Sequence, residues 1–210
     1  MNSFYWNCWG IRNPWIVHTL GNYIRRWNPK LVFLSKTKLK CRRMEKVKFR
    51  LGFPNGLIVP SRGRSGGFTL PWFSDTNLKT KNFSSHHINA IITKLGNGLL
   101  WRFTGFYGHP ETHLREESKK LLYFLRNQFN LPWFYYGDFN EILSMNEKTG
   151  GTQRSQSQMD SFRQVVNFCD FKDLGYYGPN FTWCNMKEGI DRIPIRLDRS
   201  FTTLDWLEYF

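Results

Sequence analysis

The sequence lacks the segments that direct a protein into or across a membrane. No apolar run approaches the roughly 18 residues of a membrane span, and the amino terminus has no basic segment followed by an apolar one. We therefore expect an intracellular protein of the nucleus or cytoplasm, neither secreted nor bound to a membrane. Linkers, internal repeats and low-complexity tracts are also missing, which predicts a single domain over residues 1–210.

Cysteine and histidine motifs that bind metals are missing too. The four cysteines, Cys8, Cys41, Cys169 and Cys184, are widely separated and form no Cys-x-x-Cys pair. They are expected to be reduced thiols rather than disulfides or zinc ligands. None of the five histidines belongs to a His-Glu-x-x-His motif.

Acidic residues are scarce relative to basic ones. The chain has 16 Asp and Glu residues and 30 Lys and Arg residues, which gives a surplus of 14 positive charges. Such a surplus favours a polyanionic partner, namely DNA, RNA or an acidic membrane surface. The alternative is a basic, solvated surface with no particular partner.

Hydrophobic periodicity and turn residues predict alternating strands and helices. Helices are expected at 14–27, with Asn13 as its cap, at 42–51, at 112–129 with Lys119 facing outward, and at 158–168. Strands are expected near 4–7, 31–34, 57–59, 67–72, 78–83, 88–93, 99–107, 133–136, 181–185 and 195–200. Their spacing suggests an antiparallel meander over 57–107.

The most informative segment is Gly137-Asp138-Phe139-Asn140-Glu141, which follows the apolar run from Leu131 to Tyr136. If the strand continues, Asp138 and Asn140 share a face, because strand side chains repeat every two residues. An aspartate that takes a proton or binds a cation, beside an amide that holds a phosphate oxygen, suits phosphate-ester hydrolysis. A simple turn is the alternative, since Gly, Asp and Asn are turn residues.

Further motifs are distributed along the chain, and their order is informative. They are Phe4-Tyr5-Trp6-Asn7-Cys8-Trp9-Gly10, the turn Gly63-Arg64-Ser65-Gly66-Gly67, Gly105-Phe106-Tyr107-Gly108-His109-Pro110, the segment from Gly137 to Glu141, Phe181-Thr182-Trp183 and Arg196-Leu197-Asp198-Arg199. Together they resemble the endonuclease/exonuclease/phosphatase family, and within it the endonuclease domain of plant LINE-type (non-LTR) retrotransposons. The resemblance implies an α/β fold, a four-layered sandwich of two mixed β-sheets flanked by helices.

The resemblance also implies a site and a reaction, the Mg²⁺-dependent hydrolysis of a DNA phosphodiester, with Mn²⁺ as a substitute. Asn7 resembles the residue that organises the metal site, and Tyr107 the one that contacts the phosphate. Asp138 is similar to the aspartate that positions or deprotonates water, and Asn140 to the asparagine that holds a phosphate oxygen. Asp198 resembles the aspartate that orients a catalytic histidine. Trp9, His109 and Arg199 are the expected substrate contacts.

Simpler roles exist for some of these residues. Tyr107 would cap a strand edge, Asp198 would pair with Arg196 or Arg199, and Trp9 would plug the site instead of stacking on a base.

One departure from the family pattern concerns the metal. The family carries a metal-binding glutamate in a Glu-Thr-Lys motif after the second strand, where this chain has Lys36-Thr37-Lys38. An ammonium group repels a cation, so we expect weakened metal binding. Glu45 and Glu141 are the glutamates considered as replacements.

A second departure lies at the carboxyl terminus. The family ends in a Ser-Asp-His motif, and this sequence stops at Tyr209-Phe210 without one. The resemblance thus implies a domain incomplete at its carboxyl terminus, without the last strand, and an exposed edge that favours self-association.

Three functions stay open on the sequence alone. The first is an impaired DNA endonuclease domain from a retrotransposon-like element. The others are a non-catalytic basic module that binds nucleic acid, and an enzyme acting on another phosphate ester such as a phosphoinositide or nucleotide.

Overall fold

The computed structural model describes residues 2–61 and 66–210, so the first three residues of the Gly63 to Gly67 turn lie outside the described part. The chain forms two compact units, Met1–Gly105 and Phe106–Phe210, each of which is described by itself. The single domain expected over residues 1–210 stays a prediction.

Unit 1 (Met1–Gly105) contains a mixed sheet of four strands in the order β1-β2-β4-β3. The strands are β1 (Ser3–Asn7), β2 (Leu31–Ser35), β3 (Asn55–Val59) and β4 (Phe68–Trp72). β1 and β2 are parallel, and the other pairs are antiparallel. All five residues of β2 are buried, which explains its continuous apolar sequence.

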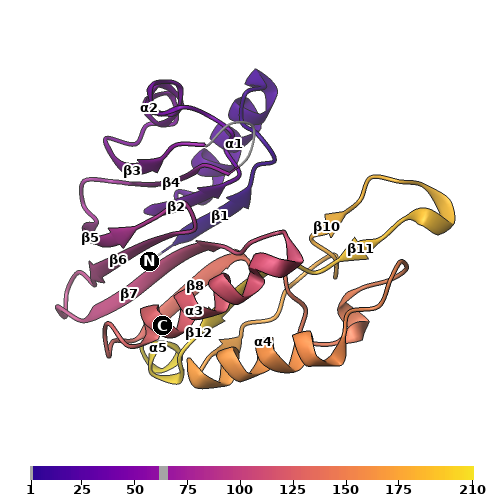
Figure 1. The fold of residues 1–210 in the computed structure, drawn as a ribbon. Coiled ribbons are helices and arrows are strands. Elements are labelled where there is room, and N and C mark those ends of the chain that lie inside the picture. Colours follow the sequence, from indigo (N-terminus) through magenta and orange to yellow (C-terminus); the bar gives the residue numbers. More distant parts are fainter. Residues whose placement is uncertain (1, 62–65) are drawn as a thin grey trace. The chain divides into compact units, whose positions relative to one another are not determined.

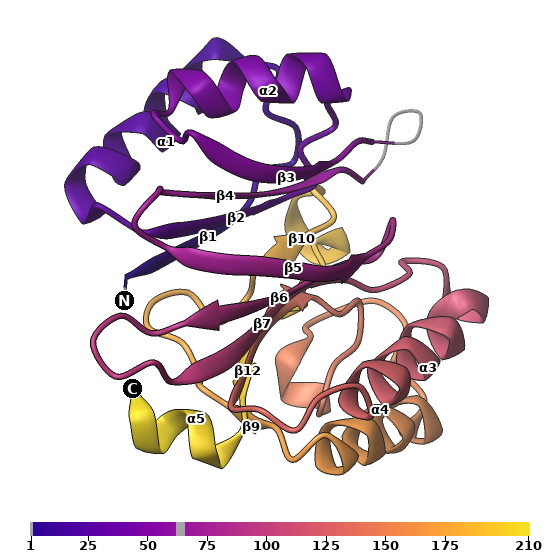
Figure 2. The ribbon, with the colours of Figure 1, turned by 90° about the vertical axis from the view of Figure 1, so that its left-hand side faces the viewer.

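Two amphipathic helices, α1 (Pro14–Trp27) and α2 (Cys41–Arg50), lie along this sheet (Figure 2). The side chain of Asn13 caps α1 as predicted, accepting a hydrogen bond from the Trp15 N–H at 2.9 Å. Helical periodicity predicts that Tyr23 and Trp27 lie on the apolar stripe of this helix, but they are 42% and 55% exposed. The buried stripe runs through Val17, Leu20, Gly21 and Ile24 instead.

The meander expected over 57–107 is wrong, because its strands belong to two sheets. β3 and β4 join the four-stranded sheet, and a turn closed by the Thr76 N–H to Phe73 carbonyl bond (2.9 Å) separates them from the next strands. These are β5 (Asn77–Phe83), β6 (His87–Thr93) and β7 (Leu100–Tyr107). They belong to a six-stranded sheet in the order β5-β6-β7-β8-β12-β9, with β8 (Trp133–Asp138), β9 (Lys172–Asp173) and β12 (Asp198–Thr202) (Figure 1).

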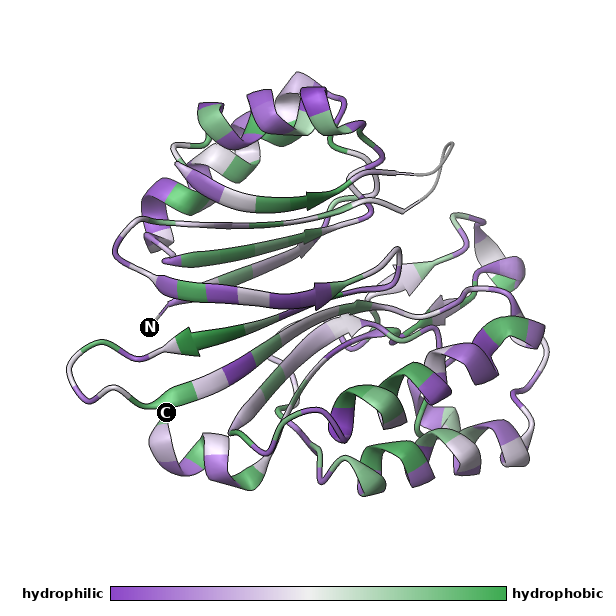
Figure 3. Ribbon diagram, turned by 60° about the vertical axis from the view of Figure 1, so that its left-hand side comes forward, coloured by the Kyte–Doolittle hydropathy of each residue, from purple (hydrophilic) through white to green (hydrophobic). Residues whose placement is uncertain are grey.

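Unit 2 (Phe106–Phe210) is built around α3 (Arg115–Arg126) and α4 (Gln156–Phe168), which pack side by side (Figure 2). Their apolar faces and strand β8 share one core, which includes Leu122, Trp133, Phe162 and Phe201. Figure 3 shows the alternating polar and apolar bands of these amphipathic helices. The helix expected from Thr112 begins instead with a 3-10 turn, η1 (Thr112–Leu114).

The remaining elements of unit 2 are short. They are η2 (Met145–Glu147), β10 (Trp183–Cys184), η3 (Gly189–Asp191), β11 (Pro194–Ile195) and α5 (Leu204–Tyr209). None of the helices formed by the described residues has the length and hydropathy that crossing a bilayer requires. Two mixed sheets with flanking helices confirm the expected α/β class.

Candidate functional site

The end of β8 brings two carboxylates together in unit 2. β8 and β12 are antiparallel, and Asp138 is the direct register partner of Asp198. Side chains of directly opposed residues lie on the same face of the sheet, with Cβ atoms about 5 Å apart. Two carboxylates in this position repel each other, so the pair favours a cation or a hydrogen-bond donor between them.

Asn140 reaches this pair by a turn, not by continuation of the strand. β8 ends at Asp138, and Asn140 has a left-handed backbone with a φ of 54°. The predicted face-sharing by strand alternation is therefore wrong, although the two residues do meet: the Asn140 N–H donates to Asp138 Oδ1 at 3.0 Å. Asn140 Nδ2 donates to the Gly108 carbonyl at 2.8 Å, which fixes the orientation of the amide.

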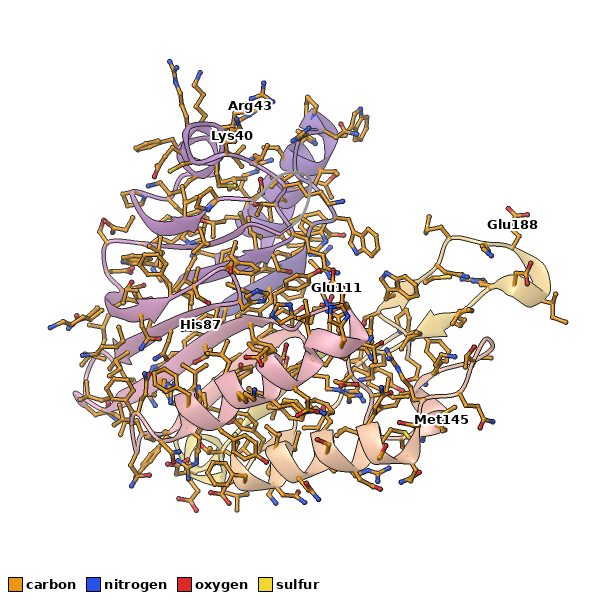
Figure 4. All side chains as sticks on the ribbon, viewed as in Figure 1. Lys40, Arg43, His87, Glu111, Met145 and Glu188 are labelled. Atoms are coloured by element: carbon orange, nitrogen blue, oxygen red, sulfur yellow. The ribbon has the colours of Figure 1, made fainter. Side chains whose placement is uncertain are left out.

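Tyr107, the last residue of β7, stands beside both aspartates. Burial is the largest cause that raises the pKa of its phenol, and the negative charges of Asp138, Glu111 and Asp198 act in the same direction, so that the pKa is about 12. Glu111 is labelled in Figure 4 just before α3. At neutral pH the phenol is therefore protonated and able to donate a hydrogen bond.

Titration of the Tyr107 phenol tests this geometry. The absorbance of the native chain minus that of Tyr107→Phe should show no tyrosinate from this residue until the pH nears the pKa of about 12. Because the folded pKa is raised, the stability that this proton contributes is complete below pH 10 and is lost as the pH rises through the folded value. Asp138→Asn should lower the midpoint, and a native midpoint near 10 would contradict the cluster.

Asp198 is held by the Phe181-Thr182-Trp183 segment. Thr182 Oγ1 accepts hydrogen bonds from the Leu197 and Asp198 N–H groups, each at 3.0 Å. Arg196 and Arg199, the two arginines considered as partners of Asp198, bind Asp173 at 2.9 and 2.8 Å.

Arg199 and His109 differ in their access to a ligand. The Arg199 side chain is 0% exposed and pairs with Glu147 and Asp173, so its burial speaks against the predicted substrate contact and for a structural role. His109 is half-buried, and its backbone N–H donates to Ser118 Oγ at 2.8 Å. Its imidazole lies close enough to Glu117 to lower the pKa of that carboxyl, after the larger effect of Lys120.

The sequence reasoning missed a buried charge cluster next to the motif. Glu141 is 3% exposed, with Arg115 Nη1 at 3.7 Å and Lys119 Nζ at 4.0 Å from its carboxylate. Burial raises the Glu141 pKa and lowers that of Arg115. Lys119 was expected to face outward, but it is buried and donates to Ser161 Oγ at 2.8 Å. The spacing of Arg115 and Lys119, one helical turn apart, was the available signal.

Unit 1 holds the remaining predicted site residues. Asn7 ends β1 opposite Ser35 of β2. Just beyond these strand ends, Lys36 Nζ and Lys38 Nζ lie 4.9 and 5.7 Å from the centre of the Trp9 ring. Trp9 is 48% exposed and thus has aromatic surface available to a ligand.

Trp9, Lys36 and Lys38 all have left-handed backbones, with φ between 51° and 53°. Such strain in residues other than glycine is uncommon and tends to occur at functional sites. The strained loops are tied together by backbone hydrogen bonds, including the Cys8 N–H to the Ser35 carbonyl at 2.9 Å and the Ile11 N–H to the Thr37 carbonyl at 3.0 Å.

The donor atoms do not fit a complete Mg²⁺ site. Among residues 2–61 and 66–210, no group of three or more His, Cys, Asp or Glu side chains is arranged to hold a metal ion. Lys36 stands where the resemblance implies a glutamate, and the possible replacements are engaged elsewhere. Glu45 pairs with Lys48 at 2.9 Å, and Glu141 lies in the buried charge cluster.

No protein-family model matches this sequence, and no curated protein sequence matches it. Solved structures do. The endonuclease domain of TRAS1, a telomere-specific non-LTR retrotransposon, is 12% identical with a TM-score of 0.68, over 97% of this chain and 85% of that one. An AP endonuclease from Archaeoglobus fulgidus is 14% identical with a TM-score of 0.70, over 98% and 87% of the two chains.

A third similar structure is that of NExo, a 3′ phosphatase from Neisseria, bound to a product DNA hairpin. It is 14% identical with a TM-score of 0.70, over 97% of this chain and 86% of that one. At such identities the similarity establishes the fold alone, and this protein therefore has the α/β fold that these three solved structures share.

Proposed function

We propose that this chain is a phosphodiester hydrolase domain of DNA-endonuclease type, derived from a retrotransposon-like element, whose hydrolysis is slow. The observation that carries the proposal is the cluster of Tyr107, Asp138, Asn140 and Asp198 at adjoining strand ends of unit 2. An acid, an amide and a protonated phenol in contact supply what hydrolysis of a phosphate ester needs from side chains.

Each side chain has a role in this proposal. Asp138 orients the attacking water and accepts its proton, and Asp198 lies directly opposite it in the sheet. The Tyr107 hydroxyl and the Asn140 amide donate hydrogen bonds to a phosphate oxygen. The fixed amide and the raised phenol pKa keep both donors ready before substrate arrives.

We propose slow hydrolysis because the set of metal ligands is incomplete. Mg²⁺ and Mn²⁺ are the ions that the resemblance implies, with Asn7 as the organising residue, and the ammonium group of Lys36, in place of a glutamate, opposes their binding. We therefore propose weak divalent-ion binding rather than a resident metal. The plant LINE origin rests on the style of the motifs.

The positive charge of the chain and the similar solved structures both favour DNA over small phosphate esters as the substrate. The surplus of 14 positive charges suits a polyanion. The similar structures include two endonucleases and a phosphatase bound to a DNA hairpin. Both points concern the partner, and neither identifies a preferred DNA sequence.

The proposal is tested with supercoiled plasmid at high protein concentration, with Mg²⁺ or with EDTA. We expect slow conversion to nicked circle that needs both Mg²⁺ and Asp138, so Asp138→Asn should match the EDTA background. Asp160→Asn, an exposed carboxylate on α4, is the matched control and should nick like the native chain. Release of inorganic phosphate from an inositol phosphate or a nucleotide, without nicking, would indicate the phosphatase alternative instead.

A further inference from the structure

The charge of this chain is distributed very unequally. Residues 1–105 contain 18 Lys and Arg residues and only two acidic residues, Glu45 and Asp75. Residues 106–210 contain 12 Lys and Arg residues and 14 acidic residues. The whole positive surplus therefore belongs to unit 1. An asymmetry of this size between two halves of a chain points to a polyanion that binds the basic half.

Within unit 1, the basic residues concentrate around α2. Eight Lys and Arg residues lie between Lys36 and Arg50, with Glu45 as the one acid among them. Three of them, Lys40, Arg42 and Arg43, line a cavity of about 350 Å³ together with Arg12 and the apolar Leu39. We call this cavity the α2 cleft. Lys40 and Arg43 are labelled in Figure 4, where their side chains project from the start of α2.

A second cavity shares lining residues with the α2 cleft. Arg12, Leu39 and Arg43 also line a neighbouring space of about 270 Å³, to which Lys46 and Arg50 add two further positive charges. Arg12 is held in position by a hydrogen bond from its Nε to the Lys38 carbonyl at 3.2 Å. We call the basic residues that line these two cavities the cationic track, namely Arg12, Lys40, Arg42, Arg43, Lys46 and Arg50.

The acids of unit 1 do not neutralise this track. Glu45 pairs with the buried Lys48 at 2.9 Å, and Asp75 pairs with Lys30 at 2.5 Å. The first turn of α2 contains no acidic residue. Several like charges held around one cavity raise the local potential and attract an anion with more than one charge.

The surface around the track favours nucleic acid over a lipid membrane. A helix that lies in a bilayer surface inserts a continuous apolar face. The apolar faces of α1 and α2 are already used, since Val17, Leu20, Ile24 and Met44 are in the core of unit 1.

Separate aromatic side chains remain outside that core. Trp15 is 75% exposed and Phe49 is 66% exposed, and their chain neighbours Pro14 and Arg50 line the second cavity. Aromatic rings beside cations are the features on which unpaired bases stack in proteins that bind single strands.

We infer that the α2 cleft binds the backbone phosphates of a single-stranded nucleic acid, with Arg42 and Arg43 as the principal contacts. This site is separate from the Tyr107 and Asp138 cluster and needs neither a divalent ion nor hydrolysis. It is a binding function of unit 1 that holds whether or not the chain cuts DNA.

The test is fluorescence anisotropy of a labelled oligothymidylate with the full chain, in EDTA, over a series of salt concentrations. Arg42→Ala/Arg43→Ala should bind about tenfold more weakly at physiological salt and lose about 1.4 from the slope of log affinity against log salt, because each single-strand phosphate contact contributes about 0.7. The matched control, Lys79→Ala/Lys81→Ala, removes two charges from β5 of the same unit and should keep the native slope. Circular dichroism checks that both variants are folded.

Three results would overturn the inference. Equal losses in the two double variants would mean that only net charge matters. Tighter binding of a duplex of the same length would exclude a single-strand site. Binding to phosphatidylserine vesicles that depends on Arg42 and Arg43, without oligonucleotide binding, would assign the cleft to a membrane. Repeating the measurement in Asp138→Asn separates this site from the proposed hydrolase, since binding should be unchanged there.

Discussion

Replacing Gly137 with alanine is expected to destabilise unit 2 by more than about 3 kcal/mol. A Cβ atom at Gly137 would lie 2.3 Å from the carbonyl oxygen and 2.8 Å from the carbonyl carbon of Phe106, both of them backbone atoms. Backbone in a sheet cannot rotate away as a flexible side chain can, so the strands must separate. Typical domains are stable by 5–15 kcal/mol, roughly, so the loss is a large fraction of the total.

The same close approach positions the candidate site. Gly137 directly precedes Asp138, and Phe106 directly precedes Tyr107. A methyl group that pushes Gly137 away from Phe106 therefore also moves the Asp138 carboxylate away from the Tyr107 phenol. Gly108 is constrained similarly, since its Cβ would lie 2.4 Å from the Phe139 carbonyl oxygen. Glycine is thus required here by space, and not by a left-handed backbone.

Urea denaturation followed by circular dichroism measures the effect. Gly21→Ala is the control, because Gly21 lies within α1 and its new Cβ would meet nothing closer than 3.6 Å. That variant should gain about 0.5–1 kcal/mol from the higher helix propensity of alanine. A Gly137→Ala chain that unfolds within about 1 kcal/mol of the native chain would show that the strands are not packed this closely.

The sequence predicted the elements with strong periodicity and missed what depends on tertiary pairing. Asn13 and Pro14 begin α1 as their chemistry requires, because capping is local. The strands before Phe73 and those after it belong to two different sheets. The local sequence does not predict this division, because strands of either sheet have the same apolar pattern. The burial of Lys119 was missed for a related reason: a lysine is expected in solvent unless a partner such as Glu141 lies inside.

The candidate site was predicted in part. Asp138, Asn140, Tyr107 and Asp198 were expected together, and unit 2 does bring them together. The reason given for Asp138 and Asn140 was wrong, because a left-handed residue after β8 replaces strand alternation. Arg199 illustrates the limit of motif reading, since the sequence cannot reveal that Glu147 and Asp173 enclose it.

The second large effect is expected from Lys36→Glu. This change places a carboxylate where the resemblance implies the metal-binding glutamate, and it removes one of the two ammonium groups at the Trp9 ring. Glutamate and lysine adopt a left-handed backbone at similar cost, so the φ of 51° at this position is no obstacle to the exchange. We expect Mg²⁺-dependent nicking to rise by about a hundredfold or more, the usual contribution of a group that acts in the transition state.

Lys38→Glu is the matched control for this change. Lys38 also lies over the Trp9 ring, at 5.7 Å, and the substitution alters net charge by the same amount two residues further along. It does not restore the Glu-Thr-Lys pattern, so no gain in nicking is expected. An equal rise in both variants would indicate that the loss of positive charge beside Trp9, and not the restored glutamate, increases Mg²⁺ binding.

The most direct test of the account is therefore the rate of plasmid nicking by the native chain, Lys36→Glu and Lys36→Glu/Asp138→Asn, each with Mg²⁺ and with EDTA. We expect slow nicking by the native chain, a large Mg²⁺-dependent gain in Lys36→Glu, and loss of that gain when Asp138 is also replaced. Fast, Asp138-dependent nicking by the native chain, or no gain from Lys36→Glu, would contradict the claim that a lysine in place of a metal ligand limits this hydrolase fold.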